Sequence, residues 1–453
     1  MNYRLIVKEC KDRLLHFSYS MYILKDIFKT IVIFILTWEA RLVLRRRRPN
    51  IICVSGSVGK TSTKDAIATV LSARYSTRKS EKSYNSDFGV PLTILGLHSG
   101  WSSPIAWLEN LILGAYEVVA PGTYPEWLVL EVGADKPGEI RNISHWLSCD
   151  IAVLTAFPDN PVHVEFFPSD SALFEEDLQV AYKLRSDQVV VVNGDDKNIV
   201  KYLPNIKAQI LTFGFDKSND WWASPETLDY NGEGKVVGLS TAIHQGENNF
   251  KLEAPGLLGY HQLYALLSAM AVGEFCGISP MAALESLREF QGPPGRLRII
   301  PGIKDTTIID DTYNASPAAV EAGLNTLAKI KTKGRRIAIL GDMLELGDRT
   351  IDAHRVVGNH VGTLCDLLIA VGLRSKFIIE GSKERGMKDA NIWHCSNSVE
   401  AGAILQDILK PGDLVYIKGS QSMRMERVVE EVMAEPDRKV ELLCRQDRIW
   451  RSK

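Results

Sequence analysis

The stretch CVSGSVGKTSTKDA, residues 53–66, joins a β-branched run to a segment whose apolar residues recur at helical spacing. A glycine turn between a strand and a helix is the context that a phosphate-binding loop requires. The backbone N–H groups of residues 56–60 can cradle phosphate oxygens at the helix N-terminus, Lys60 can reach the β- and γ-phosphates, and the Thr61 hydroxyl can hold Mg²⁺. The GxxxxGK[ST] pattern is incomplete because Val54 stands at its first glycine, and a chance glycine turn is the alternative.

Glu131 is the second residue that the strand pattern singles out. It stands near the end of the apolar run WLVLEVG (127–133), and ligands of open α/β sheets bind at the carboxyl ends of the strands. An acidic residue in an apolar strand is costly unless it is paired or bound to a metal. We therefore expect Glu131 to be a Mg²⁺ ligand, with a solvated position as the alternative.

The pattern along the chain predicts an α/β fold. Short β-branched runs alternate with amphipathic stretches from residue 50 onward, which predicts a parallel sheet covered by helices. Turn pairs within residues 220–255 predict an antiparallel edge or flap. QGPPGR (291–296) is the best linker candidate. We expect a short helical N-terminal segment (1–49), a central parallel-sheet domain (50–292) and a smaller C-terminal α/β domain (293–453).

Composition limits the class of protein. A hydrophobic content of 45%, a charged content of 24% and a formal net charge of -2 are typical of a folded protein. No global field would draw this chain to nucleic acid, so we expect no nucleic-acid partner. The seven cysteines include no CxxC pair, which argues against a disulfide framework and a zinc site and favours a cytoplasmic location.

The N-terminal segment departs from this plain profile. TIVIFILTW (30–38) is uncharged and is followed by RLVLRRRRPN (41–50). It is too short to span a bilayer, which needs roughly 20 apolar residues, and no small-residue cleavage site marks a secretory signal. Two interpretations remain open: an interfacial helix whose arginines meet anionic lipid, or a helix packed on the protein body or on a partner. The first predicts peripheral contact of residues 20–48 with the inner face of the membrane.

Nine motifs occur in the order, and near the spacing, of the Mur ligases. They are GSVGKTS, YNSDFGVPLTIL, LEVGADKPGEI, HVEFF, GYHQ, GRL, DDTYNASP, GDMLELG and KGSQSMRME. The chain resembles this family from residue 50 to about 435, and the most similar type within it is MurF, which adds D-alanyl-D-alanine to UDP-N-acetylmuramoyl-tripeptide. The resemblance implies a P-loop ATPase-like central domain, a Rossmann-like C-terminal domain, and ATP- and Mg²⁺-dependent amide-bond formation in peptidoglycan biosynthesis. The carboxylate would be activated as an acyl phosphate.

The resemblance also implies roles for residues by motif position. The implied ATP-binding residues are Gly56, Ser57, Val58, Gly59, Lys60, Thr61, Ser62, His261, Arg296, Asp311 and Tyr313. The implied metal ligands are Thr61, Glu131, His163 and Asp177, and Lys60, Glu131, His163 and Asp177 would be catalytic. The implied substrate-binding residues are Asn314, Lys418 and Ser420. Asp342 and Glu345 are expected near the incoming substrate, and His354 is expected to be structural or peripheral. Closure of the two domains would assemble the site.

Three departures from the family pattern stand out. Asp177 lies fourteen residues after His163, where the family carries a lysine that becomes carbamylated. We expect Asp177 to ligate metal directly, with Glu175 or Glu176, or an impaired site, as alternatives. Asn85-Ser86, Gln262 and Ala265 replace the usual asparagines. Residues 1–49 are too few for the family's N-terminal uridine-nucleotide-binding domain, which we expect to be missing.

Two functions of different classes are consistent with the sequence. The first is an amide ligase that acts on a peptide or nucleotide-sugar-peptide, with a lipid-linked or other carboxylate as an alternative acceptor. The second is a nucleotide-binding scaffold that has lost catalysis, which the aspartate at position 177 would explain.

Overall fold

The computed structural model describes residues 27–81, 84–101, 103–158, 166–447 and 450. The chain divides into two compact units, Met1–Lys64 with Arg74–Leu211, and Asp65–Ala73 with Thr212–Lys453. The predicted domain limits at residues 49 and 292 do not coincide with this division and stay predictions.

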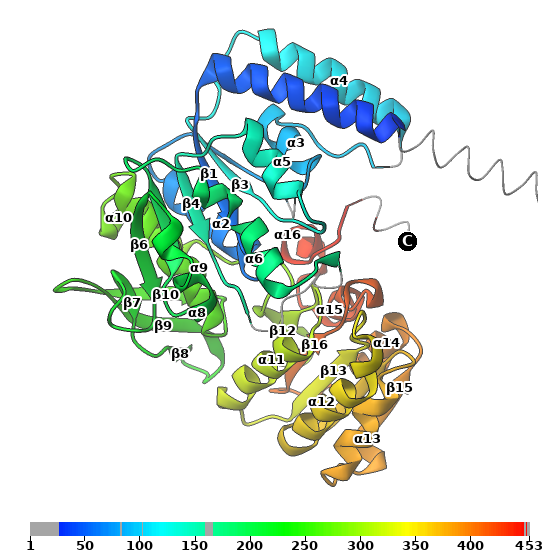
Figure 1. Cartoon of the computed structure of the whole chain (residues 1–453). Coiled ribbons are helices and arrows are strands. Elements are labelled where there is room, and N and C mark those ends of the chain that lie inside the picture. Colours follow the sequence, from blue (N-terminus) through cyan, green and yellow to red (C-terminus); the bar gives the residue numbers. More distant parts are fainter. Residues whose placement is uncertain (1–26, 82–83, 102, 159–165, 448–449, 451–453) are drawn as a thin grey trace, which may run out of the picture. The chain divides into compact units, whose positions relative to one another are not determined.

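A parallel sheet forms the core of the first unit, with the strand order β5-β4-β1-β3-β2 (Figure 1). Its strands are β1 (Asn50–Ser55), β2 (Thr77–Lys79), β3 (Trp127–Glu131), β4 (Ile151–Leu154) and β5 (Val189–Asn193). They are rich in Val, Ile and Leu, as expected of a parallel sheet buried on both faces. Since β1 is parallel to both β3 and β4, the turn after β1 and the final residue of β3 lie at the same edge of the sheet.

Helices cover this sheet. They are α3 (Gly89–Leu95), α4 (Pro104–Val119), α5 (Glu139–Trp146), α6 (Asp170–Asp177), α7 (Gln179–Tyr182), α8 (Lys197–Val200) and the 3-10 turn η2 (Leu203–Asn205). The helix α2 (Lys60–Ser72) and the strand β6 (Gln209–Gly214) begin in the first unit and end in the second.

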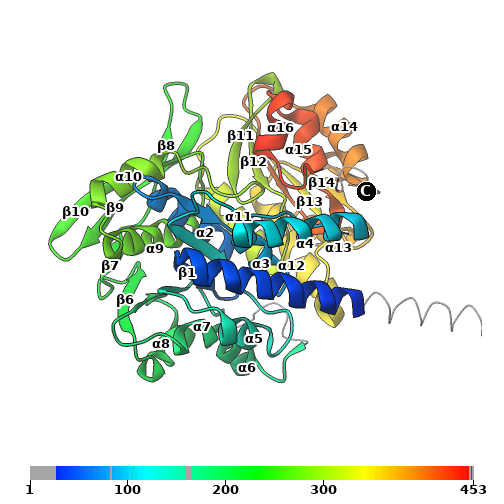
Figure 2. The same cartoon turned by 90° about the horizontal axis from the view of Figure 1, so that it is seen from above.

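A helix over residues 27–47 precedes β1 and lies beside α4 (Figure 1, Figure 2). Its buried side contributes to the core of the first unit through Val32, Leu36, Ala40 and Val43. At the end of α4, Arg46 donates to the carbonyl oxygen of Val118, and Arg47 donates to those of Ala120 and Gly122 (2.7 and 2.6 Å). Cationic side chains there satisfy carbonyls that have no partner within the helix. Packing on the protein body, one of the two interpretations of this segment, is therefore confirmed.

Glu39 is buried between this helix and α4. Its side chain sits so close to Gly114 that a Cβ at that glycine would lie 2.1 Å from Oε2, and this oxygen has no hydrogen-bond partner. Burial raises the pKa of the Glu39 carboxyl from 4.5 to about 7. The glycine is thus required by the close approach of the two helices.

The raised pKa predicts that Glu39 weakens the fold at neutral and higher pH. The folded protein binds this proton more tightly than the unfolded chain does, so the cost is absent below the unfolded pKa and grows as the pH rises from about 4.5 to 7. We expect Glu39→Gln to raise the free energy of unfolding at pH 8 by about 1–3 kcal/mol, with little gain near pH 4.5. Urea unfolding at the two pH values measures this. An equal gain in the free energy of unfolding at both pH values would contradict the raised pKa of Glu39. The same response in the exposed control Glu109→Gln would contradict it too.

The second unit contains antiparallel strands and a mixed sheet. The antiparallel strands β8, β9 and β10 and the short strand β7 lie within residues 221–255, which confirms the predicted antiparallel edge or flap. The mixed sheet has the order β11-β12-β16-β13-β14-β15, in which β11 is antiparallel to β12 and the other pairs are parallel. The predicted α/β fold is confirmed, including the second α/β alternation.

The elements of the second unit have the following bounds. The strands are β7 (Trp221–Ala223), β8 (Thr227–Tyr230), β9 (Val236–Gln245), β10 (Asn248–Pro255), β11 (Arg298–Gly302), β12 (Thr306–Asp311), β13 (Arg336–Gly341), β14 (Leu367–Val371), β15 (Ile392–Cys395) and β16 (Leu414–Lys418). The α-helices are α9 (His261–Phe275), α10 (Pro280–Arg288), α11 (Pro317–Lys329), α12 (Thr350–Leu364), α13 (Lys376–Glu384), α14 (Ser398–Ile408), α15 (Glu426–Val432) and α16 (Lys439–Leu442). The strand β12 ends at Asp311, because the N–H of Thr312 turns back to the Asp310 carboxylate (3.2 Å).

Candidate active site

The turn between β1 and α2 is built for close contact with the end of β4. Gly56 and Gly59 have left-handed φ angles of 129° and 88°, which side chains rarely tolerate. A Cβ at Gly56 would lie 2.4 Å from Oγ1 of Thr155. The Thr155 hydroxyl donates to the carbonyl oxygen of Val58 (2.6 Å), and the N–H of Ser57 donates to that of Ala156 (2.9 Å). The strand end therefore fixes the conformation of the predicted phosphate loop.

Lys60 is the first residue of α2, and its side chain folds back over this loop. Its Nζ donates to the carbonyl oxygen of Gly56. A Cβ at Gly133, just after β3, would lie 3.2 Å from Cε of Lys60 and 3.0 Å from Nδ2 of Asn85. The glycine leaves room for the lysine, and Asn85 lies beside it. The ammonium group is thus held at the loop, where it can neutralise phosphate charge.

Glu131 ends β3 and is 1% exposed. The Nζ of Lys64 lies 3.6 Å from Oε2 of Glu131, and this oxygen has no hydrogen-bond partner. The hydroxyl of Ser57, in the loop itself, is also buried without a hydrogen bond. A buried carboxylate oxygen without a hydrogen bond is costly, and hard cations such as Mg²⁺ prefer oxygen ligands of this kind.

Mg²⁺ fits the residues at this edge of the sheet. This ion is usually held by one or two carboxylates together with substrate phosphates and water, and the Glu131 carboxylate and the Thr61 hydroxyl provide such oxygens. Across the described ranges, no three His, Cys, Asp or Glu side chains form a metal-binding cluster. His163, the predicted second-metal ligand, lies outside the described residues.

Asp177 belongs to the same site, because its carboxylate reaches the phosphate loop from the end of α6. Oδ1 accepts a hydrogen bond from the Ser55 hydroxyl (3.0 Å). Burial raises the Asp177 pKa to about 6, while the charge of Lys60 and hydrogen bonds from Ser55 and the Gly56 backbone oppose the shift. The acidic group that replaces the expected lysine therefore lies near Lys60.

A second cluster lies in the second unit, at the ends of β12 and β16. Asp311 and Lys418 are directly paired in the register of these parallel strands. Oδ2 of Asp311 accepts hydrogen bonds from Nζ of Lys418 (2.6 Å) and from the Tyr416 hydroxyl (3.0 Å). Burial lowers the Lys418 pKa, and the Asp311 carboxylate opposes that shift. The buried lysine therefore has a carboxylate partner.

Three further predicted residues lie close to this pair. The guanidinium carbon of Arg296 lies 4.3 Å from the centre of the Tyr313 ring, in cation–π contact. His261 begins α9, and its neighbour Gln262 donates to the carbonyl oxygen of Arg296 (2.9 Å), which holds this helix start beside Arg296. The structure thus places Lys418 in the same unit as four of the ATP-binding residues that the family resemblance implies, which are His261, Arg296, Asp311 and Tyr313.

Arg445 holds the loop that carries Tyr313, and sequence reasoning missed it. Its guanidinium donates to the carbonyl oxygens of Thr312 (2.6 Å) and Tyr313 (2.8 Å) and to Oε2 of Glu426 (2.6 Å). Arg445 is 8% exposed. It follows the described motifs in the sequence and has no signature that would have marked it.

We expect Arg445→Met to destabilise the second unit and to weaken nucleotide binding. The change leaves two carbonyl oxygens without their donor and removes one of the two arginines that pair with the buried Glu426, the other being Arg424, so we expect a cost of about 2–4 kcal/mol. Thermal unfolding and the Kd for ATP measure the two effects. Arg438→Met, which removes only exposed ion pairs with Glu435 and Glu441, is the matched control. Equal behaviour of the two variants would contradict a positioning role.

Other predicted residues have structural partners. The Ser420 hydroxyl accepts from the N–H of Leu344 (2.8 Å), and Oδ1 of Asn314 accepts from the N–H of Gln421 (3.3 Å). Oδ1 of Asp342 accepts from the N–H groups of Arg374 (3.0 Å) and Ser375 (2.8 Å). His354 is buried and accepts from the N–H of Met343 through Nε2 (3.0 Å). Its predicted structural role is confirmed.

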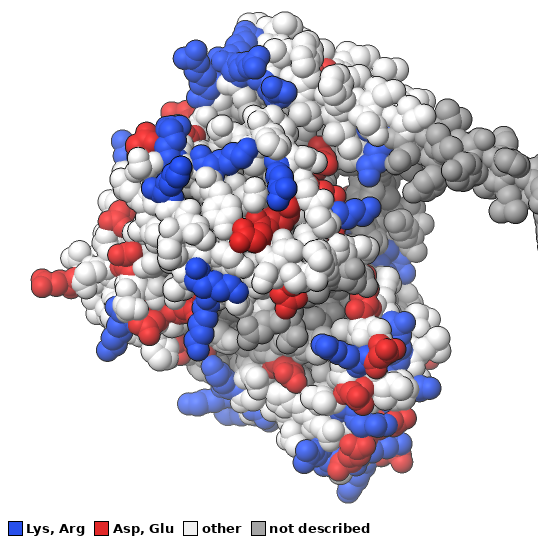
Figure 3. All heavy atoms as spheres, in the orientation of Figure 1, with Lys and Arg blue, Asp and Glu red and all other residues white. Residues whose placement is uncertain are grey.

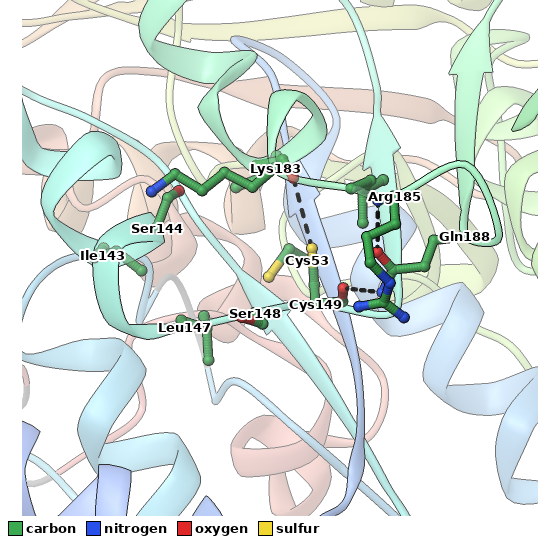
Figure 4. A pocket seen from close by; sticks show the side chains of 11 residues that line it. Cys53, Ile143, Ser144, Leu147, Ser148, Cys149, Lys183, Arg185 and Gln188 are labelled. Carbon is green, nitrogen blue, oxygen red and sulfur yellow. Dashed lines mark hydrogen bonds between the residues drawn. The ribbon is translucent and has the colours of Figure 1, made fainter. Parts of the chain in front are cut away.

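A small cavity beside β1 does not coincide with either cluster (Figure 4). It is lined by Cys53, Cys149, Lys183 and Gln188, among others. Nε2 of Gln188 donates to the carbonyl oxygen of Cys149 (2.9 Å), and its Oε1 accepts from the N–H of Arg185 (2.8 Å). Its wall thus contains internal hydrogen bonds and none of the predicted site residues.

Comparison with known proteins assigns both halves of the chain. Residues 54–273 match the model of the Mur ligase middle domain, and residues 295–421 match that of the Mur ligase glutamate ligase domain.

Individual relatives and structures agree with these matches. UDP-N-acetylmuramoyl-tripeptide--D-alanyl-D-alanine ligase of Bacillus subtilis is 28% identical over 398 residues, which cover 88% of this chain and 79% of the relative. The ligase of the same name from Mycobacterium leprae is 27% identical over a region that covers 82% of this chain and 71% of that relative. The crystal structure of MurF ligase from Thermotoga maritima in complex with ADP matches with a TM-score of 0.69 at 23% identity. The match covers 90% of this chain and 84% of that structure's chain.

Proposed function

Because this chain belongs to the Mur ligase family, we propose that it is an ATP-dependent amide ligase that adds D-alanyl-D-alanine to a UDP-N-acetylmuramoyl-tripeptide. The two relatives described above carry the name of this activity at 28% and 27% identity. The proposed reaction belongs to peptidoglycan synthesis, and we propose that it takes place in the cytoplasm.

The observation that carries the proposal is the combination of Lys60 and Glu131 at one edge of a parallel sheet. Lys60 is held over a phosphate loop, and the buried Glu131 carboxylate has an oxygen with no hydrogen-bond partner. This pair suits the binding of a nucleoside triphosphate with its cation.

In the proposed reaction, a substrate carboxylate oxygen attacks the γ-phosphorus of ATP, which gives an acyl phosphate and ADP. The amine of the second substrate then attacks the acyl carbon, so a C–N bond forms, inorganic phosphate leaves and the amine loses a proton. Lys60 and the loop N–H groups bind and neutralise the phosphate oxygens during the first step. Glu131, Thr61 and Asp177 would hold Mg²⁺, which when bound supplies further charge neutralisation at the transferring phosphoryl group.

We propose that the second cluster serves the same reaction. Arg296 and Tyr313 offer a cation and an aromatic face to a nucleotide, with His261 and Asp311 beside them. Lys418, held by Asp311, would contact the γ-phosphate or the incoming amine. Ser420 and Asn314 would act by fixing the neighbouring loops, since both accept hydrogen bonds from backbone N–H groups.

Phosphate release from ATP and Mg²⁺ tests the proposal, with UDP-N-acetylmuramoyl-tripeptide offered with and without D-alanyl-D-alanine and the ligated product detected by mass. We expect release and product only when both substrates are present. Nucleotide binding without phosphate release in any acceptor mixture would favour a scaffold that has lost catalysis.

One observation favours a second acceptor class. The helix over residues 27–47 has exposed aromatic and aliphatic side chains, including Phe34 and Trp38, and we propose that it makes peripheral contact with the membrane. A lipid-linked carboxylate would then be an alternative acceptor. Product formation with such an acceptor, and none with the nucleotide-linked one, would identify it.

A further inference from the structure

The helix over residues 27–47 has a row of apolar side chains on its outer side. Ile27, Ile31, Phe34 and Trp38 are 51, 51, 71 and 56% exposed. Their spacing of three or four residues places them on one side of the helix. The opposite side is buried in the core of the first unit, so the exposed row is not needed to hold the helix in place.

The neighbouring helix α4 has a second such row. Ile105, Leu108, Ile112, Tyr116 and Val119 are 59–71% exposed and follow the same helical spacing. The buried positions of α4 are Trp107, Asn110 and Gly114. Its more apolar side therefore faces outward, which is the reverse of an ordinary surface helix.

The two rows belong to one surface, which we call the outer face and define by the nine residues just named. The two helices lie side by side, as Glu39 beside Gly114 and the arginine contacts at the end of α4 show (Figure 2). Monomeric soluble proteins rarely expose contiguous apolar patches larger than a few hundred Å², and nine large side chains from two adjacent helices form a patch that calls for an occupant.

Positive charge is concentrated at one end of the outer face. Arg41 and Arg45 continue the row of Ile27 and Trp38 at the same helical spacing, and Arg48 follows directly after the helix. All three arginines are exposed. Figure 3 shows basic side chains gathered at the end of an otherwise largely uncharged surface over these helices. Glu109 is the acidic exposed residue of α4, so cations predominate.

An apolar row bordered by arginines is the pattern of a surface that lies in the boundary between acyl chains and anionic headgroups. A second copy of the chain would offer this face only the same apolar rows and arginines, whereas anionic headgroups complement the arginines directly. Among the described helices, none is both long enough and apolar enough to cross a bilayer. The geometry therefore favours a contact parallel to the surface.

We propose that the outer face docks the protein on an anionic lipid surface, with α4 and the helix over residues 27–47 both lying in the interface and Arg41, Arg45 and Arg48 contacting the headgroups. This inference rests on the peripheral contact proposed above and adds α4 and the orientation. It does not depend on the ligase chemistry.

Flotation of the full chain with lipid vesicles tests the proposal. The vesicles contain phosphatidylcholine alone or phosphatidylcholine with phosphatidylglycerol. We compare the parent with Phe34→Glu/Trp38→Glu on the first helix, Ile112→Glu/Tyr116→Glu on α4, and Arg41→Glu/Arg45→Glu at the charged end. Met281→Glu is the matched control, because Met281 is 66% exposed in α10 of the second unit.

We expect the parent and Met281→Glu to float with the anionic vesicles, to be released by high salt, and to remain at the bottom with phosphatidylcholine alone. Each double variant should lower the partition coefficient at least about 10-fold, since charged residues in the interface are unfavourable and each surface arginine contributes to anionic binding. The loss in the α4 variant separates this proposal from an anchor made by the N-terminal helix alone.

Three results would overturn the proposal: no flotation of the parent, unchanged flotation of the α4 variant, or a dimer in lipid-free sedimentation that the same variants dissociate. Circular dichroism of each variant checks that the fold is retained. Phosphate release with soluble substrates, measured on the same proteins, separates the two hypotheses. If the parent releases phosphate but does not float, the proposal for the outer face alone fails. If the parent floats but does not release phosphate, the proposed ligase activity alone fails.

Discussion

Replacing Lys60 with alanine is expected to lower the rate of phosphate release about 10³-fold or more, because the ammonium group neutralises charge on the transferring phosphoryl group. Lys64, one helical turn further along, is buried and lies beside Glu131. Lys60→Arg should also be poorly active, since Gly133 and Asn85 lie closely against the lysine side chain and a guanidinium is larger and planar.

Lys388→Ala is the matched control, because Lys388 is exposed in the second unit, and it should retain the parent rate. Steady-state phosphate release under saturating substrates measures the rates, and circular dichroism verifies the fold. A Lys60→Ala protein with a rate within tenfold of the parent would show that this loop does not act in phosphoryl transfer. The proposal of a ligase would then lose its main support.

The rate of the proposed reaction is expected not to depend on bicarbonate, because Asp177 supplies a carboxylate of its own. The family resemblance places a carbamylated lysine at this position, and such a group needs dissolved carbon dioxide to form. Asp177 provides a carboxylate without that step. Its neighbours are occupied elsewhere, because Glu176 accepts from the N–H of Arg141 (2.9 Å) and Glu175 accepts from the Tyr182 hydroxyl (3.0 Å). Of these three carboxylates, that of Asp177 accepts a hydrogen bond from Ser55, directly before the phosphate loop.

We expect the parent to work at the same rate in carbon-dioxide-depleted buffer and in added bicarbonate, and Asp177→Asn to be about 100-fold slower, since an amide keeps the shape but removes the negative charge. Asp177→Lys should regain activity only when bicarbonate is added. Glu175→Gln is the control within the same helix. Stimulation of the parent by bicarbonate would contradict direct ligation, as would full activity of Asp177→Asn.

The site residues that could be predicted from the sequence pattern are those whose signal lies in a few neighbouring residues. Lys60 follows a glycine turn between a strand and a helix, and Glu131 is an acidic residue at the end of an apolar strand. Both signals arise within a few residues, because a phosphate loop and a strand end are local structures. The pairing of Asp311 with Lys418 could not be derived in this way, since it depends on the register of two strands more than one hundred residues apart.

The residues that were missed act through long-range contacts. Thr155 fixes the phosphate loop from the end of β4, and Arg445 fixes the loop after β12 from the C-terminal region, yet each is an ordinary residue in its own segment. The orientation of α4 was also beyond reach. Periodicity identifies an apolar side but assumes that this side is buried, whereas α4 buries Trp107, Asn110 and Gly114 and exposes its isoleucines.

The way in which the helix over residues 27–47 is held has a consequence for hydrogen exchange and for truncated forms of the protein. Its inner residues belong to the core cluster that includes β1, and its arginines close the end of α4. Amide protons of residues 32–43 should therefore exchange as slowly as those of the central strand, in one cooperative opening unit. Removing the helix to prevent lipid contact would uncover that core and leave α4 without its donors, so the truncated chain would aggregate for reasons unrelated to any membrane.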